Sequence, residues 1–451
     1  MSASTSKSSD TVTRRPIATK GGSLSGTVTA PGDKSISHRS LILSALAKGE
    51  SAITGLLEAD DVLRTAASMR ALGASVERDG PGKWRVIGEQ WQSPEKSLYF
   101  GNSGTGVRLV MGAVAGAGIR ASFDGDISLR GRPMGRVLEP LRMMGVEADD
   151  REGRLPVTIK ENGNGLRAVE VKLASASAQV KSAILLAALG ASGTVRVHEP
   201  VLCRDHTERM LSAFGVELST ASDGKDGRFI TMDGGQSLKP CDVNVPGDPS
   251  SAAFAIAAAL IVPHSDVVVK GVLLNPLRTG LYQTLREMGA DITFENQRVE
   301  NGEDVADIRA RHSVLRGIEV PAARAPSMID EYPILSVVAA FAHGETMMTG
   351  LEELRVKESD RIASVEAGLV ACGADAVSGP DWLKVSGAGG TPGMIGGALI
   401  KTNHDHRIAM SFLVAGLASE QPIEIDDASM IATSFPDFID QINSIGGNIK
   451  Q

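Results

Sequence analysis

Residues 30–40 read APGDKSISHRS and lead into an apolar segment, residues 41–47, that predicts a buried helix. The same frame returns as VPGDPSS at residues 245–251, before a second apolar helix but without the two cations. This segment is typical of an anion-binding site, because it combines the free N–H groups of a helix start with serine hydroxyls and the cations Lys34 and Arg39. A copy without cations indicates a duplicated scaffold in which one part carries the chemistry. The contrast predicts an enzyme that handles phosphate.

The composition excludes several classes of protein. The chain has 451 residues, of which 42% are hydrophobic and 22% charged, so we expect a globular protein with two domains. A net charge of -8 and an aromatic content of 4% argue against nucleic-acid binding. Cys203, Cys241 and Cys372 are too widely spaced for a disulfide framework or a zinc site.

No segment predicts a membrane span or a secretory signal. The longest apolar run, residues 252–262, stops at Pro263 and is about half as long as a bilayer requires. Residues 1–22 are rich in Ser, Thr and basic residues without an apolar core, so we predict a disordered tail, with a remnant of an organelle-targeting peptide as the alternative. We expect a cytoplasmic protein.

Two series of helices alternate along the chain. Six amphipathic segments end at a glycine, which adopts the left-handed conformation at a helix end and lets a strand begin. These glycines are Gly73, Gly145, Gly215, Gly289, Gly373 and Gly446. Between them lie Ala-rich segments that predict buried helices, at residues 40–47, 107–117, 180–191, 252–262, 334–342 and 408–418. The long period predicts an α/β fold of two similar domains with three modules each, joined near Pro246.

The polar residues before the helices indicate where the function lies. All six segments before the buried helices contain capping residues, and parallel helices would point three positive dipole ends of each half at one face. Residues 130–133, 204–207 and 355–361 add cations before the exposed helices. Cations are therefore expected to gather where the helix starts gather.

Several charged residues allow two interpretations. Lys34 and Arg39 are unfavourable at a helix start unless an anion binds there. Asp330, also at a helix start, is either a cap or a catalytic base. Glu358 and Arg361 are three residues apart, so they either form a surface ion pair or face one ligand together.

Metal and dinucleotide cofactors are not expected. His404 and His406 flank Asp405, but residues two apart at a helix start do not converge on one metal ion. Residues 101–106, GNSGTG, lack the spacing of a dinucleotide-binding loop. Their small side chains instead let backbone N–H groups approach a compact ligand.

Eight motifs in a fixed order carry a family resemblance. They are PGDKSISHR, GNSGTGVR, GRPMGR, SASAQVKSA, SMIDEYP, EELRVKESDR, NHDHRIAMSF and TSFPDF. They cover almost the whole chain, which closely resembles the 3-phosphoshikimate 1-carboxyvinyltransferases, or EPSP synthases, and is most similar to their bacterial second class. The resemblance implies two domains of three βαβαββ units with buried parallel helices, an inside-out barrel-like arrangement. It also implies a domain I of residues 23–33 plus 246–451, a domain II of residues 34–245, and an active site in the cleft between them.

The resemblance implies a reaction as well. The enolpyruvyl group of phosphoenolpyruvate would pass to the 5-hydroxyl of shikimate 3-phosphate with release of phosphate, by addition and elimination through a tetrahedral intermediate. This is a step of the shikimate pathway toward chorismate and the aromatic amino acids. The enzyme would have no cofactor and would be inhibited by glyphosate, and its domains would close on the substrates and expel water. Two three-module domains can bury their own cores, which favours a monomer.

Matching the motifs residue by residue implies two sets of binding residues. Those for shikimate 3-phosphate are Lys34, Ser35, Arg39, Ser177, Ala178, Gln179, Arg204, Asp330 and Lys357. Those for phosphoenolpyruvate are Lys34, Gly104, Arg132, Gln179, Arg361 and Arg407. Asp330 would accept the hydroxyl proton, and either Glu358 or Lys34 would protonate the methylene carbon. Neighbouring cations should keep Glu358 ionised, so the sequence leaves this choice open.

Two residues depart from the family's pattern. Ser434 stands where some relatives have a Lys, so one cation for phosphoenolpyruvate is missing or supplied from elsewhere. Gly104 stands where glyphosate-tolerant second-class members have Ala, whose methyl group would crowd the inhibitor. We therefore expect a more glyphosate-sensitive enzyme than those relatives.

Two other functions fit such a scaffold. One is enolpyruvyl transfer to UDP-N-acetylglucosamine, but enzymes of that kind resemble these motifs far less and generally use a loop cysteine that this chain does not offer. The other is a non-catalytic protein that binds a phosphorylated ligand. It would need the cations but neither Asp330 nor Glu358, and both carboxylates are present.

Overall fold

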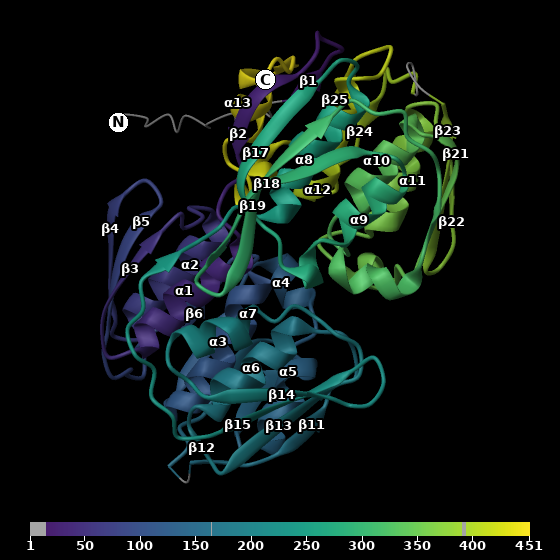
Figure 1. Ribbon diagram of the computed structural model, residues 1–451. Coiled ribbons are helices and arrows are strands. Elements are labelled where there is room, and N and C mark those ends of the chain that lie inside the picture. The colour runs from purple at the N-terminus through teal and green to yellow at the C-terminus, as the bar shows by residue number, and fades with distance from the viewer. Residues whose placement is uncertain (1–14, 164, 390–393) are drawn as a thin grey trace, which may run out of the picture.

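The chain folds into two lobes with separate hydrophobic cores (Figure 1). The computed structural model describes residues 15–163, 165–389 and 394–451. The core of the N-terminal lobe is drawn from residues 36–245 together with Leu273, and that of the C-terminal lobe from residues 18–30 and 252–449. The chain therefore starts in one lobe, builds the other, and returns. No helix among the described residues is both long and apolar enough to cross a bilayer.

Six buried helices occupy the two cores. They are α1 (Lys34–Leu46), α3 (Gly104–Ala117) and α6 (Ala178–Ala188) in the N-terminal lobe, and α8 (Pro249–Ile261), α10 (Tyr332–Phe341) and α12 (His406–Gly416) in the C-terminal lobe. All six were predicted, but each begins earlier than its apolar segment. The capping residue decides the start: Asp33 accepts a hydrogen bond from the N–H of Ile36 at 2.8 Å, so α1 includes a polar first turn.

Small residues let the buried helices approach closely. Gly112 of α3 faces the backbone of α6, where a Cβ added to the glycine would lie 2.6 Å from the Cα of Ala183. Any side chain at this position would push the two helices apart. The glycine and alanine content of these segments is therefore a packing requirement.

Six more helices cover the cores with one apolar face, and each is followed by one of the predicted glycines. They are α2 (Asp60–Ala71), α5 (Gly135–Met143), α7 (His206–Ala213), α9 (Gly280–Glu287), α11 (Arg361–Ala371) and α13 (Phe438–Ser444). The six glycines have positive φ angles, from 79° at Gly373 to 110° at Gly73, which confirms the prediction. Shorter helical segments are α4 (Ile127–Gly131), η1 (Pro276–Arg278), η2 (Ala322–Ser327), η3 (Glu352–Val356) and η4 (Ser429–Thr433).

The described residues form six mixed four-stranded sheets, each with one parallel and two antiparallel pairs. In the N-terminal lobe the sheets are β16 (Val243–Asn244), β3 (Gly49–Thr54), β5 (Lys83–Gly88), β4 (Ser75–Gly80); β6 (Leu98–Tyr99), β7 (Ala121–Asp124), β9 (Arg154–Ile159), β8 (Ala148–Arg151); and β11 (Glu170–Lys172), β13 (Thr194–Glu199), β15 (Arg228–Asp233), β14 (Leu218–Ser222). In the C-terminal lobe they are β18 (Asp291–Glu300), β19 (Glu303–Arg311), β17 (Asp266–Leu273), β2 (Ser25–Thr29); β20 (Glu319–Val320), β21 (His343–Thr349), β23 (Trp382–Ala388), β22 (Asp375–Ser378); and β24 (Leu399–Ile400), β25 (Ile423–Ile425), β1 (Ile17–Ala18), β26 (Ile449–Lys450). A short pair, β10 (Leu166–Arg167) and β12 (Ala191–Ser192), lies beside them.

Two strands exchange lobes at the Pro-Gly-Asp segments. β2 pairs with β17 in the C-terminal lobe just before α1 begins, and β16 pairs with β3 in the N-terminal lobe just before α8 begins. Between them the two connections run side by side, since the N–H of Asp33 donates to Pro246 at 2.7 Å and that of Asp248 to Pro31 at 2.8 Å. The repeated motif therefore forms a double crossing between the lobes.

The N-terminal strand corrects one prediction. Residues 1–14 of the predicted disordered tail lie outside the described residues, but Ile17 and Ala18 form β1 between β25 and β26. Ala18 is fully buried against α12, where a Cβ added to Gly416 would lie 2.7 Å from its own. Two apolar residues in a polar stretch were enough to form a strand between two strands from the other end of the chain.

Candidate active site

Helix starts from both lobes meet at the joint between them. Within the N-terminal lobe, Gln179 near the start of α6 donates to the hydroxyl of Thr105 near the start of α3 at 2.9 Å. Across the joint, the N–H of Lys34 at the start of α1 lies 3.4 Å from the carboxylate of Asp248, which caps α8. The convergence expected from the sequence is present, and it places several predicted site residues together.

Asp330, just before α10, is surrounded by cations of both lobes. Arg204 of the N-terminal lobe donates to one carboxylate oxygen at 2.7 Å, and Arg361 donates to the other at 3.0 Å. Lys357 lies 3.7 Å away, and Arg407 donates to the backbone carbonyl of Asp330 at 3.2 Å. Burial acts to raise the pKa of Asp330, but these cations outweigh it and hold the pKa well below its usual range. The carboxylate is therefore ionised.

The two interpretations of Asp330 can be compared directly. The N-cap residue of α10 is Glu331, and no side-chain capping bond is made there. Glu331 is buried, its carboxylate accepts from the hydroxyl of Ser250, and burial beside Asp330 raises its pKa. Asp330 thus has no capping role, which favours the interpretation as a functional carboxylate.

Glu358 forms a second point of contact between the lobes. It accepts a hydrogen bond from Arg361 at 2.6 Å and lies 3.8 Å from Arg132 of the N-terminal lobe, which also donates to Asn102 at 2.6 Å. Burial acts to raise the pKa of Glu358, but Arg361 and Arg132 outweigh it and lower the pKa. A groove of about 650 Å³ beside α11 opens at this carboxylate.

Arg361 is held by a residue that sequence reasoning did not select. This guanidinium is only 1% exposed and reaches Asp405 at 2.8 Å as well as Asp330 and Glu358. Asp405 caps α12 by accepting from the N–H of Arg407 at 3.0 Å, so its position is fixed by the helix. Three carboxylates around one guanidinium give Arg361 a fixed orientation.

Lys34, the first residue of α1, pairs with Asp61 of α2. Asp61 is buried and was not selected from the sequence, because 27 residues separate it from its partner and no local pattern links them. Burial and the charge of Arg407, with a smaller effect of Lys34, lower the pKa of the nearby His406 to about 4. The imidazole ring of His406 is therefore neutral at neutral pH.

Arg39 is a buried cation whose hydrogen-bond partners among the described residues are all neutral. It donates to the hydroxyls of Thr207 at 2.7 Å and Ser182 at 2.8 Å, and to the backbone carbonyl of Ser35 at 2.8 Å. Burial lowers its pKa to about 10, which is still far above neutral pH. A fixed guanidinium without a directly bonded carboxylate is well suited to bind an anionic ligand.

Arg108 is another residue that sequence reasoning missed. It donates to the side chain of Gln179 at 2.7 Å and to the backbone of Pro133 at 3.0 Å, and burial lowers its pKa to about 10. A Cβ added to Gly104 would lie 3.1 Å from both Arg108 and Arg132. The signal was present, because Gly104 and Arg108 are one helical turn apart and share a face.

Three further predicted residues lie at helix starts without joining the central ion pairs. Ser177 caps α6 by accepting from the N–H of Val180 at 3.4 Å, and Ser35 and Ala178 are half-buried at the starts of α1 and α6. Ser434 is buried, and its hydroxyl has no hydrogen-bond partner among the described residues.

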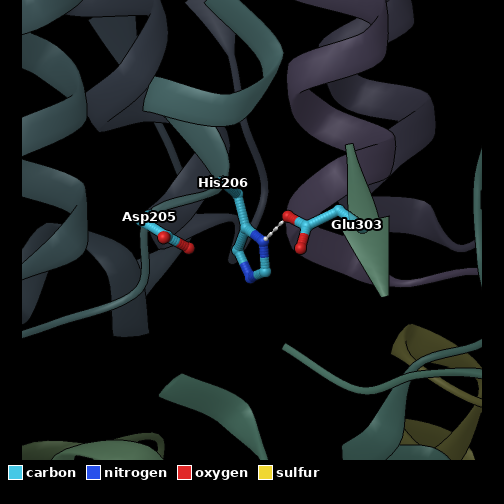
Figure 2. Close-up of side chains that lie close together, drawn as sticks. All are labelled: Asp205, His206 and Glu303. Carbon is cyan, nitrogen blue, oxygen red and sulfur yellow. Dashed lines mark hydrogen bonds and ion pairs between the residues drawn. The ribbon is translucent and has the colours of Figure 1, made fainter. Parts of the chain in front are cut away.

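One cluster places potential metal ligands together. Figure 2 shows Asp205 and His206 of the N-terminal lobe beside Glu303 of the C-terminal lobe, with ligand atoms all within 4.8 Å of one another. However, Asn275 donates to Asp205 at 2.7 Å and to Glu303 at 2.9 Å, and Arg209 lies 3.1 Å from Asp205 and 3.6 Å from Glu303. Arg209 and Asn275 already bind these carboxylates, so we interpret the cluster as a contact between the lobes.

The fold and this cation-rich joint define the class of protein. The solved enolpyruvyl transferase NikO from Streptomyces tendae matches the fold with a TM-score of 0.75 at 19% identity, covering 97% of this chain and 98% of that one. The chain therefore has the α/β fold of the enolpyruvyl transferases, as predicted.

Closer comparisons identify the family. A family model described as EPSP synthase (3-phosphoshikimate 1-carboxyvinyltransferase) matches residues 18–442. A solved EPSP synthase from Acinetobacter baumannii is 42% identical, with a TM-score of 0.87 and coverage of 97% of this chain and 100% of that one. The 3-phosphoshikimate 1-carboxyvinyltransferases of Phenylobacterium zucineum (strain HLK1) and Paracoccus denitrificans (strain Pd 1222) are 55% and 57% identical, over 96% of this chain and 95% and 97% of theirs. The chain belongs to the EPSP synthase family.

The predicted activity is confirmed by these relatives. The chain is a transferase of the shikimate pathway, which moves a carboxyvinyl group to 3-phosphoshikimate and serves the synthesis of aromatic amino acids. UDP-N-acetylglucosamine transfer and a purely ligand-binding role are set aside.

Proposed function

We propose that both substrates bind and react at the joint between the lobes, and that residues 23–33 plus 246–451 and residues 34–245 are the two domains that close on them. The observation that carries this proposal is Asp330, which pairs with Arg204 of one lobe and Arg361 of the other. Carboxylates and cations from separate lobes meet at this point, so closure of the lobes would assemble the site.

Shikimate 3-phosphate would occupy the side of the joint near α1 and α6. The cations Arg39 and Arg204 are suited to its phosphate and carboxylate, because charge-assisted bonds to guanidinium are strong and directional. The proposed binding residues are Lys34, Ser35, Arg39, Ser177, Ala178, Gln179, Arg204, Asp330 and Lys357. Support comes from the neutral partners of Arg39, which leave its charge available.

Phosphoenolpyruvate would lie against the start of α3 and the cations of the C-terminal lobe. The proposed binding residues are Lys34, Gly104, Arg132, Gln179, Arg361 and Arg407. Arg132 and Arg361 both reach Glu358 in this structure, so they already converge on one anionic group. A phosphate or carboxylate of the substrate would compete with Glu358 for them.

Asp330 would act as the base in the addition step. Its ionised carboxylate accepts the proton of the 5-hydroxyl while the hydroxyl oxygen bonds to the central carbon of phosphoenolpyruvate. The lowered pKa of Asp330, caused by the surrounding cations, keeps it ready to accept a proton. When the tetrahedral intermediate collapses, that proton leaves with the phosphate.

Glu358 would give a proton to the methylene carbon and take one back from the resulting methyl group. In this structure its pKa is lowered by Arg361 and Arg132 despite burial. Once those two arginines bind phosphoenolpyruvate, burial and the anionic substrate both raise the pKa of Glu358. Lys34, held by Asp61, would then stabilise negative charge and need not donate the proton.

Replacing Asp330 tests the proposed function. Asp330→Asn should still bind shikimate 3-phosphate in a calorimetric titration, while phosphate release falls by roughly 10²–10⁴ because the base is lost. Glu353→Gln is a matched control: Glu353 belongs to an exposed ion pair with Arg136 and should change the rate by less than about twofold. Normal phosphate release by Asp330→Asn would contradict the assigned role.

We propose further that the chain is a cytoplasmic monomer of the bacterial second class and that glyphosate inhibits it. Each lobe buries its own core, which supports a monomer. A methyl group at Gly104 would press on Arg108 and Arg132 at 3.1 Å. Gly104→Ala should therefore raise the inhibition constant of glyphosate more than the KM of phosphoenolpyruvate, and an unchanged inhibition constant would defeat this proposal.

A further inference from the structure

A buried charged cluster lies behind the segment that carries Arg204. Lys181 of α6 is fully buried, and its ammonium contacts Glu199 at 2.9 Å and Glu208 at 2.8 Å. Arg228 of β15 reaches the same two carboxylates at 2.7 Å and 3.2 Å. Two cations thus face two carboxylates in an apolar lobe, an arrangement that is costly to desolvate unless it serves a purpose.

The cluster forms hydrogen bonds with Cys203, the residue before Arg204. Glu199 accepts from the backbone N–H of Cys203 at 2.8 Å and from its thiol at 2.6 Å. Lys181 and Arg228 both donate to the backbone carbonyl of Cys203, at 3.2 Å and 3.3 Å. Both backbone groups of Cys203 are therefore held by the cluster, one residue before Arg204.

The far side of Arg204 is held as well. His206 lies 2.7 Å from Glu303 of the other lobe, the contact drawn in Figure 2. Thr207, next along the chain, accepts from Arg39 at 2.7 Å and bonds to Ser182, the neighbour of Lys181 on α6. The backbone is therefore held at Cys203 and at the start of α7, on both sides of Arg204, which restricts where the Arg204 side chain can point.

We infer that Lys181 and Glu199 are positioning residues for shikimate 3-phosphate, which act by fixing the backbone at Cys203 and thereby aiming Arg204. This inference rests on the proposed role of Arg204 in binding that substrate. Lys181 and Glu199 are both fully buried. Besides each other, their polar partners are Cys203, Glu208 and Arg228, all of the N-terminal lobe. Nothing in the catalytic steps requires them directly.

The first test is Lys181→Met, which keeps the length of the side chain and removes its charge. The dissociation constant of shikimate 3-phosphate should rise by about tenfold, while the KM of phosphoenolpyruvate and kcat at saturation change by less than about threefold. Lys172→Met, an exposed lysine of β11 in the same lobe, is the matched control and should change neither. An unchanged dissociation constant, or equal losses in all three quantities, would overturn the inference.

A second variant covers the case in which Lys181→Met fails to fold. The double variant Lys181→Met with Glu199→Gln leaves Arg228 facing Glu208 as a balanced pair, so it avoids an excess buried carboxylate. It should fold and still bind shikimate 3-phosphate about tenfold more weakly. Binding equal to that of the unmodified chain would contradict the inference.

Arg204→Gln separates this inference from the proposed function. Alone it should weaken shikimate 3-phosphate binding, and adding Lys181→Met should cause no further loss, because the two act through one group. If Arg204→Gln binds normally, the proposed role of Arg204 fails and the inference fails with it. If the losses of binding free energy from the two substitutions add, Arg204 keeps its proposed role. Only the inference that Lys181 positions Arg204 would then be wrong.

Discussion

The two Pro-Gly-Asp segments each precede a buried helix, α1 in one lobe and α8 in the other, but these helices begin with different residues. Asp33 caps α1 through the N–H of Ile36, and Asp248 caps α8 through the N–H of Ser250, both at 2.8 Å. Five residues after the cap, α1 carries the buried His38, whereas α8 has the apolar Ala253 at the corresponding place. The caps are alike, and the first two turns differ.

This difference shows that both copies can keep the same backbone and cap while only one of them provides charged side chains to the candidate site. The copies are joined by Arg278, which is buried and donates to Asp33 at 3.0 Å, to Asp248 at 3.1 Å and to Ser250 at 2.9 Å. One cation thus pairs with both capping carboxylates at the crossing. The second copy contributes support, and the first contributes Lys34 and Arg39.

Removing Arg278 should weaken both helix caps at once, and we expect it to have the largest effect on stability. Arg278→Met leaves Asp33 and Asp248 buried without their counter-charge, so the free energy of unfolding should fall by about 3–5 kcal/mol. Urea unfolding measures this change. Arg298→Met, at an exposed ion pair of β18, is the control and should cost less than about 1 kcal/mol. A loss below 1 kcal/mol for Arg278→Met would show that the caps do not depend on it.

Replacing the first helical residue of each copy should show which copy contributes to catalysis and which only to the fold. Lys34→Met removes a cation of the joint and should lower kcat/KM for phosphoenolpyruvate by roughly 10²–10³. Pro249→Ala changes the equivalent residue of α8, which bears no charge, and should leave kcat/KM within about twofold. Steady-state assays of phosphate release compare the two, and similar losses in both would mean that the copies are not functionally distinct.

The glycines of the two copies should also respond unequally. A Cβ at Gly32 would overlap the carbonyl oxygen of Gly55 and lie 3.2 Å from the N atom of Leu57, whereas a Cβ at Gly247 would lie 3.2 Å from its nearest neighbours, Ala30 and Gly271. Gly32→Ala should therefore lower the free energy of unfolding by about 2–3 kcal/mol and Gly247→Ala by less than about 1 kcal/mol. Their thermal midpoints provide the measurement, and the reverse order would contradict the packing described.

The smallest effect concerns pH. Burial, with the charges of Lys34 and Arg39, holds the pKa of His38 well below the ordinary value of 6.5. The unfolded chain binds the proton more readily, so this contribution to stability is complete above pH 6.5 and is lost as the pH falls below it, by at most about 1.4 kcal/mol per pH unit. His38→Gln should reduce the loss of unfolding free energy between pH 7.5 and pH 5.5. The buried His406 remains in both proteins, so an unchanged loss would assign the effect to other groups.

The sequence predicted those parts of the molecule that depend on local patterns. The buried helices follow from runs of apolar residues, and the six positive φ angles follow from glycine at a helix end. The starts of the helices were placed too late because their first turns are polar, as at Lys34. The strand at Ile17 and Ala18 was missed because its partners, β25 and β26, lie at the other end of the chain.

Site residues followed the same division. Residues inside a recognisable motif, such as Asp330 and Arg361, could be selected from the sequence, and the structure places them in contact at 3.0 Å. Arg108 was overlooked although it lies one helical turn after Gly104. Asp61 and Lys181 could not be selected, because each is defined by a partner in another part of the chain. Their importance depends on tertiary contact, which no local spacing reveals.

The exchange of β2 and β16 has a consequence for synthesis of the protein. β2 leaves the ribosome before the N-terminal lobe, yet its partner β17 begins only at Asp266, after that entire lobe. The N-terminal lobe can fold as soon as β16 emerges, while β1 and β2 wait unpaired beside it. The sheet that contains β1 depends on β25 and β26, which are among the last residues to be made, so the C-terminal lobe is complete only when translation is nearly finished.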